Sequence, residues 1–241
     1  MKLVPPGKSI LLHVCCAPCS GAIIEALCSQ GFKPTVFWSN SNILSAEENS
    51  RRLAVLEPYA ASFGVPVVVD PYDHADWLAF VRGQLSDGRH LSATDLASYP
   101  ERGARCEMCF RYRLLRAARY AVARGYDCLT TSLASSRWKS LEQVDAAGTW
   151  AVALANAEAG AARPFAEVFC EGQGRGGSGA KGTGRLAPAS ELQWWPQNWR
   201  KGGLQPRRAE IIREQNFYNQ TFCGCEFSAA TPSKSTNNQS I

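Results

Sequence analysis

Three cysteines stand close together near the start of the chain, at Cys15, Cys16 and Cys19. A thiolate is both a nucleophile and a ligand for soft metal ions, so a group of thiols can bind a metal or carry out redox chemistry. A single cysteine is often no more than a small buried apolar residue. Three within so short a stretch favour a chemical role over that alternative.

Two more thiols follow at Cys106 and Cys109, separated by two residues as metal ligands often are. Together with Cys15 and Cys16 they offer four thiolates, which suits either a structural zinc ion or an iron–sulfur cluster. The direct adjacency of Cys15 and Cys16 favours iron, because zinc sites usually space paired ligands about two to four residues apart. The sequence therefore predicts a metal site, with iron ahead of zinc.

A different arrangement stands near the C-terminus, where Cys223 and Cys225 flank Gly224. The glycine permits the sharp fold that a bridge between such close cysteines requires, and the resulting disulfide should be strained and easily reduced. Such a bridge is typical of a redox-active pair. The alternative is that the two thiols are further metal ligands or structural cysteines.

The elements that must position these thiols alternate between strands and helices. Ile10–Val14 is an aliphatic run typical of a buried parallel strand, and it places Cys15 and Cys16 at the strand's carboxyl end, where ligands of α/β sheets bind. Further strands are predicted over 35–38, 65–69 and 128–133, and helices over 45–59, 70–87, 110–124, 141–147 and 206–215. This alternation predicts an α/β fold with a Rossmann-like parallel sheet.

Composition limits what kind of protein this is. The 241 residues are 45% hydrophobic and 20% charged, with a formal net charge of +5, as in a globular protein. No apolar run approaches the roughly 20 residues of a membrane span, and no apolar signal segment precedes Ile10, so we expect a cytoplasmic protein with no membrane partner. In that reducing compartment ten cysteines argue for metal or redox chemistry. Cys28 and Cys128 are expected in the core, and Cys170 has no evident partner.

The domain organisation follows from a shift in composition. We expect an α/β core domain over residues 1–155, a flexible Gly-rich insertion over 156–192, a C-terminal segment over 193–228 that completes the active site, and a disordered tail over 229–241. The insertion is too poor in apolar residues to pack a core of its own.

Five stretches match a known pattern in order along the chain. They are Leu12-His-Val-Cys-Cys-Ala-Pro-Cys-Ser20, Asn40-Ser-Asn-Ile43 with Glu47 and Arg51, Glu101-Arg-Gly-Ala-Arg-Cys-Glu-Met-Cys-Phe-Arg-Tyr-Arg-Leu114, Thr130-Thr-Ser-Leu133 and Tyr218-Asn-Gln-Thr-Phe-Cys-Gly-Cys-Glu-Phe-Ser228. The sequence resembles the epoxyqueuosine reductase family of the QueH type. The resemblance implies an adenine-nucleotide-hydrolase-like fold and an oxidoreductase that reduces epoxyqueuosine at the tRNA wobble position to queuosine, the last step of queuosine biosynthesis, without cobalamin.

The resemblance also implies roles for individual cysteines. The ligands of a [4Fe-4S] cluster would be Cys15, Cys16, Cys106 and Cys109. The catalytic redox-active pair would be Cys223 and Cys225, and Cys19 would bind one additional iron. The partners implied are tRNA that carries epoxyqueuosine in its anticodon and an external electron donor.

Three features depart from the family pattern, and none involves these cysteines. Ser41 stands where proline is expected in an Asn-Pro-Asn motif, Asn198 precedes Trp199-Arg-Lys201 where an Asp-Phe-Arg-like run is usual, and the glycine-rich insertion is long.

Substrate contacts are expected from the second matched stretch and from a basic segment near the C-terminus. The expected residues are Asn40, Asn42, Arg51, Arg200 and Lys201. Residues 194–213 combine arginines and Lys201 with three tryptophans, and basic groups bind phosphates while aromatic rings stack on bases. The alternative is that these tryptophans belong to the core and the arginines to an ordinary solvated face.

Two other functions are alternatives for this sequence. An ATP-dependent tRNA-modifying enzyme of the related pyrophosphatase fold needs a phosphate loop after the first strand, and Cys19-Ser-Gly-Ala22 lacks the required glycine-rich pattern. A zinc-bound, non-catalytic RNA-binding module would use the same cysteines. Colour separates the last possibility, because an iron–sulfur protein is brown and a zinc protein is colourless.

Overall fold

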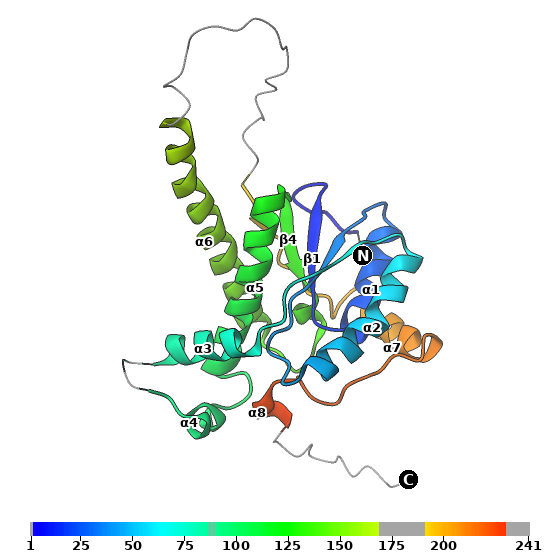
Figure 1. Cartoon of the computed structure of the whole chain (residues 1–241). Coiled ribbons are helices and arrows are strands. Elements are labelled where there is room, and N and C mark those ends of the chain that lie inside the picture. The colour runs from blue at the N-terminus through cyan, green and yellow to red at the C-terminus, as the bar shows by residue number, and fades with distance from the viewer. Residues whose placement is uncertain (1, 87, 89, 169–190, 230–241) are drawn as a thin grey trace, which may run out of the picture.

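The computed structural model describes residues 2–86, 88, 90–168 and 191–229. Its centre is one sheet of five parallel strands in the order β3-β2-β1-β4-β5 (Figure 1). The strands are β1 Ile10–Val14, β2 Thr35–Trp38, β3 Val67–Val69, β4 Cys128–Thr131 and β5 Gln193–Trp194. The predicted Rossmann-like α/β fold is confirmed.

From β1 the chain adds β2 and β3 on one side of the sheet and then β4 and β5 on the other side, so the strand order reverses at β1. On one side Leu11 of β1 lies opposite Thr35 of β2, and on the other side it lies opposite Leu129 of β4. In parallel α/β sheets ligands bind outside the carboxyl ends of the strands at such a reversal. The residues that follow β1 and β4 are therefore the first place to look for a site.

Helices cover both faces of the sheet, which explains why β1 is buried along its whole length. On one face lie α1 (Ala17–Cys28), α2 (Ala46–Ser62) and α7 (Leu204–Glu214), and on the other lie α5 (Ala104–Arg124) and α6 (Leu141–Val168) (Figure 1). The shorter helices are η1 Ser132–Ser135, α3 His74–Leu85, α4 Ala93–Ser98 and α8 Glu226–Ala229. Within the described ranges, no helix has the length and apolar character needed to cross a membrane.

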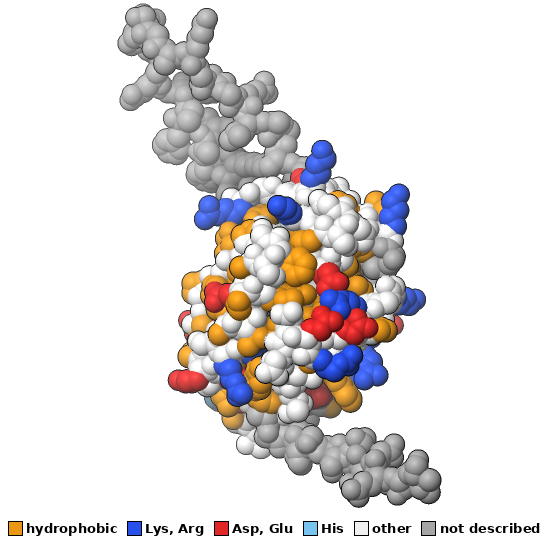
Figure 2. Space-filling model, turned by 90° about the vertical axis from the view of Figure 1, so that its right-hand side faces the viewer, with side chains coloured by type: hydrophobic (Ala, Val, Ile, Leu, Met, Phe, Trp, Pro, Cys, Tyr) orange, Lys and Arg blue, Asp and Glu red, His pale blue; other side chains and the backbone are white. Residues whose placement is uncertain are grey.

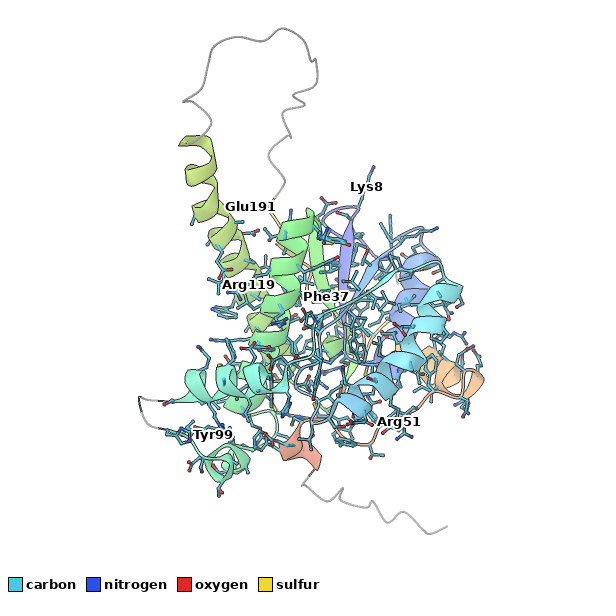
Figure 3. All side chains as sticks on the ribbon, viewed as in Figure 1. Lys8, Phe37, Arg51, Tyr99, Arg119 and Glu191 are labelled. Carbon is cyan, nitrogen blue, oxygen red and sulfur yellow. The ribbon has the colours of Figure 1, made fainter. Side chains whose placement is uncertain are left out.

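The ends of the molecule can be followed in Figure 3. Lys8, just before β1, lies at one end, and Arg51 and Tyr99 lie toward the other end, where α8 is found. The strands run from the first end to the second, so α8 and the C-terminal cysteines lie at the carboxyl edge of the sheet.

Helices α2, α3, α4 and η1 begin with a side-chain cap, whereas α7 and the two cysteine-bearing helices α1 and α5 do not. Ser45 Oγ, for example, accepts a hydrogen bond of 3.2 Å from the Glu48 N–H at the start of α2. By contrast, α1 and α5 begin after Cys16 and Gly103 with no side-chain cap. Both helices carry cysteines near their first turn, where the positive end of the helix dipole favours a thiolate.

Several elements differ from the sequence-based expectation. Helix α5 begins at Ala104 rather than at residue 110, so Cys106 and Cys109 are helical. Helix α6 does not end at residue 147 but continues to Val168. Gly148 explains this difference, because a Cβ there would lie 2.3 Å from the Trp194 ring, and its absence lets the helix pass close over β5. Helix α4 and strand β5 were not expected.

The structure describes only part of the expected insertion and of the expected tail. Residues 156–168 of the expected insertion form the end of α6. Residues 169–190, which include Cys170 and the glycine-rich run, and residues 230–241 of the expected tail lie outside the described residues.

Candidate active site

The first thiol group lies at the junction of β1 and α1. Cys15 follows the last residue of β1, Cys16 is the N-cap of α1 and Cys19 is in its first turn. The Sγ atoms of Cys15 and Cys16 are 3.9 Å apart, and the three Sγ atoms lie within 4.8 Å of one another. Among the described residues this is the one group of Cys, His, Asp or Glu ligand atoms so closely spaced. Its spacing fits the binding of a metal.

Local hydrogen bonds make one of these thiols more acidic than the other two. Hydrogen bonds from Cys16 and Cys19 lower the pKa of Cys15 well below its usual value. The same interaction with Cys15 raises the pKa of Cys16 and raises that of Cys19 to about 11. Ser132 of η1, directly after β4, makes two hydrogen bonds to Cys15. Its hydroxyl donates to Cys15 Sγ at 3.4 Å and accepts from the Cys15 N–H at 3.0 Å.

The second and third thiol groups lie together. Burial, with smaller contributions from the thiols of Cys223 and Cys225, raises the pKa of Cys109 to about 12, so these side chains are close enough to interact. Burial also raises the pKa of Cys106, again with a contribution from Cys223 and Cys225. Cys109 and Cys225 belong to one cluster of buried side chains. The structure therefore brings the Cys106 pair and the Cys223 pair into one neighbourhood, as a carboxyl-edge site requires.

Two cations connect the thiol groups. Arg113 of α5 is buried, and its charge lowers the pKa values of both Cys15 and Cys109. Burial lowers the pKa of Lys139, but Cys223, Cys15 and Cys19 outweigh this effect, so that the pKa is raised overall. Each cation thus acts on thiols from different parts of the chain. Positive charge of this kind is what a site with several thiolates needs.

Arg113 is itself held in place by the ends of two strands. Its Nε donates to the Ser39 carbonyl at 3.2 Å, and its Nη2 donates to Asn40 Oδ1. The Asn40 amide donates in turn to the Val14 carbonyl at 2.9 Å. Asn40 therefore joins β1 to Arg113 with both ends of its side chain.

His13 of β1 hydrogen-bonds to both neighbouring strand ends at the same edge of the sheet. Its Nδ1 lies 2.7 Å from Thr131 Oγ1 of β4, and its Nε2 lies 3.2 Å from the Ser39 carbonyl after β2. Burial, together with Arg113, lowers the pKa of His13 to about 3, so the imidazole is neutral. Because a carbonyl can only accept, Nε2 carries the proton and Nδ1 accepts from the threonine hydroxyl.

The Cys223-Gly224-Cys225 loop has a specific backbone conformation. Gly224 has φ of +112°, a region that other residues rarely adopt. Its carbonyl accepts a hydrogen bond of 2.9 Å from the Leu44 N–H, and its N–H donates to Ser228 Oγ at 3.2 Å. Cys223 and Cys225 are free thiols in this structure.

The five residues expected to contact the substrate differ in how far they are buried and in the contacts that they make. Asn40 and Asn42 are buried, and Asn42 Oδ1 has no hydrogen-bond partner among the described residues. Arg51 is exposed, and its guanidinium lies 3.7 Å from the centre of the Tyr218 ring. Arg200 donates to the carbonyls of Ser136 and Lys139, each at 2.7 Å, and Lys201 is exposed.

The tryptophans of the basic segment belong to the interior. Trp195 is buried, and Trp199 is fully buried and donates from Nε1 to the Thr131 carbonyl at 3.1 Å. For these two the core alternative is correct. Arg207 of the same segment pairs with Glu25, Glu210 and Glu214. On the face drawn in Figure 2, basic side chains are scattered, and acidic ones gather around one of them.

Sequence reasoning missed several residues that shape the site. Arg113 and Ser132 lie in stretches that the sequence pattern singled out and Lys139 does not, and spacing alone could not show that these three residues act on the thiols. Arg52, which lies against the C-terminal cysteine loop, carried no sequence signal beyond its place in a helix. The tryptophan that is exposed near the site is Trp138, not one of the tryptophans in the basic segment.

The donor set fits a metal centre. The closely spaced group consists of Cys15, Cys16 and Cys19, and Cys106 and Cys109 are not part of it. Seven thiols surround the carboxyl edge, none of them is in a disulfide, and four thiolates are the usual ligands of a [4Fe-4S] group. Arg113 and Lys139 supply positive charge beside them. The fold and the site thus define a Rossmann-like α/β protein with a metal-binding thiol centre where the sheet reverses.

Comparison with known proteins places the chain more narrowly. The family model described as "Epoxyqueuosine reductase QueH" matches residues 10–163 and 180–231. Relatives with that name from Histophilus somni and Haemophilus influenzae are each 31% identical over 96% of this chain and 76% of their own length. A third, from Acinetobacter baylyi, is 30% identical over 95% of this chain and 84% of its own. The chain belongs to the epoxyqueuosine reductase QueH family, a family of oxidoreductases.

Proposed function

We propose that this chain reduces epoxyqueuosine at the wobble position of the tRNA anticodon to queuosine, the last step of queuosine biosynthesis. The observation that carries the proposal is the gathering of three thiol groups around Arg113 and Lys139 at the carboxyl edge of the sheet, in a chain of this family. The first strand is not followed by the glycine-rich sequence of a phosphate loop. Thiol chemistry is the chemistry that the residues offer.

The electron balance of the reaction suits a dithiol. Opening the epoxide to an alkene removes its oxygen as water and consumes two electrons and two protons. Two thiols that form a disulfide release two electrons and two protons. One oxidation of Cys223 and Cys225 therefore balances one reduction of the epoxide. An external electron donor would return the pair to the thiol state.

We assign the other thiols to metal. In this proposal Cys15, Cys16, Cys106 and Cys109 hold a [4Fe-4S] cluster, and Cys19 binds one additional iron. Such a cluster, when bound, transfers electrons one at a time. Arg113 and Lys139 favour the thiolate forms of the ligands and offset the negative charge that the site accumulates. The protein would act in the cytoplasm, where both its tRNA substrate and cellular reductants are present.

The substrate side of the site would use groups around this edge. Asn42, whose buried Oδ1 has no hydrogen-bond partner among the described residues, would accept a hydrogen bond from the modified base. Arg51 and Lys201 are exposed and would contact phosphates, as Arg and Lys commonly do in RNA complexes. Asn40 and Arg200 already bond within the protein and would act by holding the site in shape.

The reaction is tested by nucleoside analysis. A bacterial strain without an epoxyqueuosine reductase is given this chain, and its tRNA nucleosides are separated and weighed by mass spectrometry. The proposal predicts queuosine, one oxygen atom lighter than epoxyqueuosine, with the intact chain and epoxyqueuosine alone with Cys225→Ser. Epoxyqueuosine that persists with the intact, soluble chain would contradict the proposal.

The cofactor is tested separately on purified protein. Anaerobic preparation should give a brown protein whose visible absorption is bleached by dithionite. A colourless protein that contains zinc would instead support the RNA-binding module without catalysis.

A further inference from the structure

One tryptophan stands exposed beside the thiol site. Trp138 lies in the loop that follows η1, and 74% of its surface is exposed. A single exposed apolar residue needs no explanation by itself. What sets Trp138 apart is the way in which its loop is held and the charge that surrounds it.

Side chains from three other segments bind the backbone of this loop. Arg102 donates to the carbonyls of Arg137 and Trp138, at 2.9 and 3.0 Å. Arg200 donates to the carbonyls of Ser136 and Lys139. Gln205 donates to the Ser135 carbonyl at 2.9 Å. Five consecutive carbonyl groups, from residue 135 to residue 139, are thus held by side chains, so the indole is exposed on a fixed backbone. A ring carried on a fixed backbone loses less entropy on stacking than one in a mobile loop.

The loop is also surrounded by positive charge. Arg102, Arg137 and Arg200 form no ion pair with an acidic side chain in the part of the chain that the structure describes, whereas Lys139 interacts with the thiols. Carbonyl acceptors orient a guanidinium but do not neutralise it. Partial burial, and to a smaller extent the charge of Arg102, lowers the pKa of Arg200, so these two cations act on each other. An exposed ring within such a field suits a partner that is both aromatic and anionic.

The same loop is joined directly to the thiols. A backbone hydrogen bond at Arg102 acts on the Cys106 thiol, while the Arg102 side chain holds Trp138. Lys139, the next residue after Trp138, interacts with Cys15, Cys19 and Cys223. The loop that carries the indole therefore borders the site in which the modified base would react.

We propose that Trp138 is the platform on which an unpaired base of the tRNA anticodon loop stacks, with Arg137 beside it binding a phosphate. This inference rests on the proposed function, because it assigns the RNA contact of that same site. Unpaired loop bases stack on aromatic side chains, and each such contact contributes about 1–3 kcal/mol by alanine substitution. A base held at the rim would fix the loop while the modified nucleoside enters the site.

The test measures binding of a fluorescently labelled anticodon stem–loop RNA by anisotropy, over a range of salt concentrations. Trp138→Ala should raise the Kd by roughly 5- to 150-fold, and Trp138→Phe should retain most of the affinity. Trp138→Ala should leave the salt dependence of binding unchanged. Arg137→Ala should reduce the slope of the logarithm of the binding constant against the logarithm of the salt concentration by about one, because one phosphate contact is lost. Val4→Ala is the matched control, because Val4 is 72% exposed and precedes β1, at the other end of the sheet.

The outcomes separate this inference from the proposed function. If the intact protein converts epoxyqueuosine in tRNA but Trp138→Ala binds RNA as tightly as the parent, the inference fails and the function stands. If Trp138→Ala binds RNA normally and only its reduction by a protein electron donor slows, Trp138 belongs to a protein contact and the inference fails. If the intact protein neither binds the RNA nor converts epoxyqueuosine, both fail.

Discussion

Arg52 of α2 donates a hydrogen bond of 3.1 Å from Nη1 to the main-chain carbonyl of Cys223, joining a helix on one face of the sheet to the C-terminal cysteine loop. The same buried guanidinium pairs with Glu48 at 2.7 Å and lies 5.1 Å from the centre of the Phe222 ring. Because these contacts come from three directions, Arg52 fixes the backbone on which Cys223 and Cys225 are placed.

Gly224→Ala should disturb this loop and lower turnover. The new Cβ would lie 2.9 Å from Arg52 Nη1, and φ at this position is +112°. Holding another residue in such a conformation costs about 1–3 kcal/mol, and the contact with Arg52 adds to this cost. Gly31→Ala is the matched control, because Gly31 also has positive φ, +83°, but open space around its Cβ. Chemical unfolding and turnover are measured on both variants. Full turnover by Gly224→Ala would show that the loop geometry is not required.

Arg113→Met should weaken both the protein and its thiol site. The substitution removes two hydrogen-bonded contacts of a buried charge, to Ser39 and Asn40, and should cost about 1.5–3 kcal/mol of unfolding free energy for each such bond. It also removes a charge that lowers the pKa values of Cys15 and Cys109, so metal loading should fall at neutral pH and recover as the pH rises. Iron content is compared with Arg113→Lys, which keeps the charge. Equal loading at all pH values in the three proteins would rule out the electrostatic role.

The cysteine variants should separate into two groups. Cys15→Ser and Cys106→Ser should lose iron and visible absorption, because each removes a proposed cluster ligand. Cys223→Ser and Cys225→Ser should keep both and lose repeated turnover. Cys28→Ser, at the end of α1, is the control and should retain iron and activity. If the Cys223 and Cys225 variants are colourless and poor in iron, that pair belongs to the metal site and the ligand assignment is wrong.

Cys128 should make the metal-free protein less stable in alkali. Burial, with a smaller effect of Asp127, raises the pKa of Cys128 from 9.0 to about 12. A raised pKa means that the folded state keeps the proton longer than the unfolded state, so its contribution to stability is complete below pH 9 and is lost as the pH rises toward 12. The loss approaches about 1.4 kcal/mol per pH unit. Cys128→Ala should therefore show a shallower fall of Tm across this window than the parent. Parallel curves would mean that other groups cause the alkaline effect.

The sequence predicted those features that depend on local pattern. Ile10–Val14 and Thr35–Trp38 were predicted as strands because short runs rich in β-branched, aliphatic and aromatic residues mark strands covered on both faces. Placement of Cys15 and Cys16 at a carboxyl edge followed from the first of these. The length of α6 was missed because Gly148 ordinarily weakens a helix, and only its contact with Trp194 explains why it is tolerated.

Features that depend on tertiary contacts could not be read from the sequence. Arg113 and Lys139 meet the thiols only after β1, α5 and the loop after η1 are assembled. Trp199 and Trp138 have similar basic surroundings in the sequence, yet one is fully buried and the other is exposed. An aromatic residue suits either environment, so its position in the fold decides which one it has.

The most direct test of the account is a single-turnover experiment without an external donor. Metal-loaded protein is reduced, freed of reductant under anaerobic conditions and mixed with tRNA that contains epoxyqueuosine, and both queuosine and titratable thiols are counted. The account predicts that queuosine forms with the loss of two thiols for each molecule of product, and that Cys225→Ser shows no such thiol loss. Queuosine formed by the parent with all its thiols retained would contradict the central claim that Cys223 and Cys225 supply the electrons.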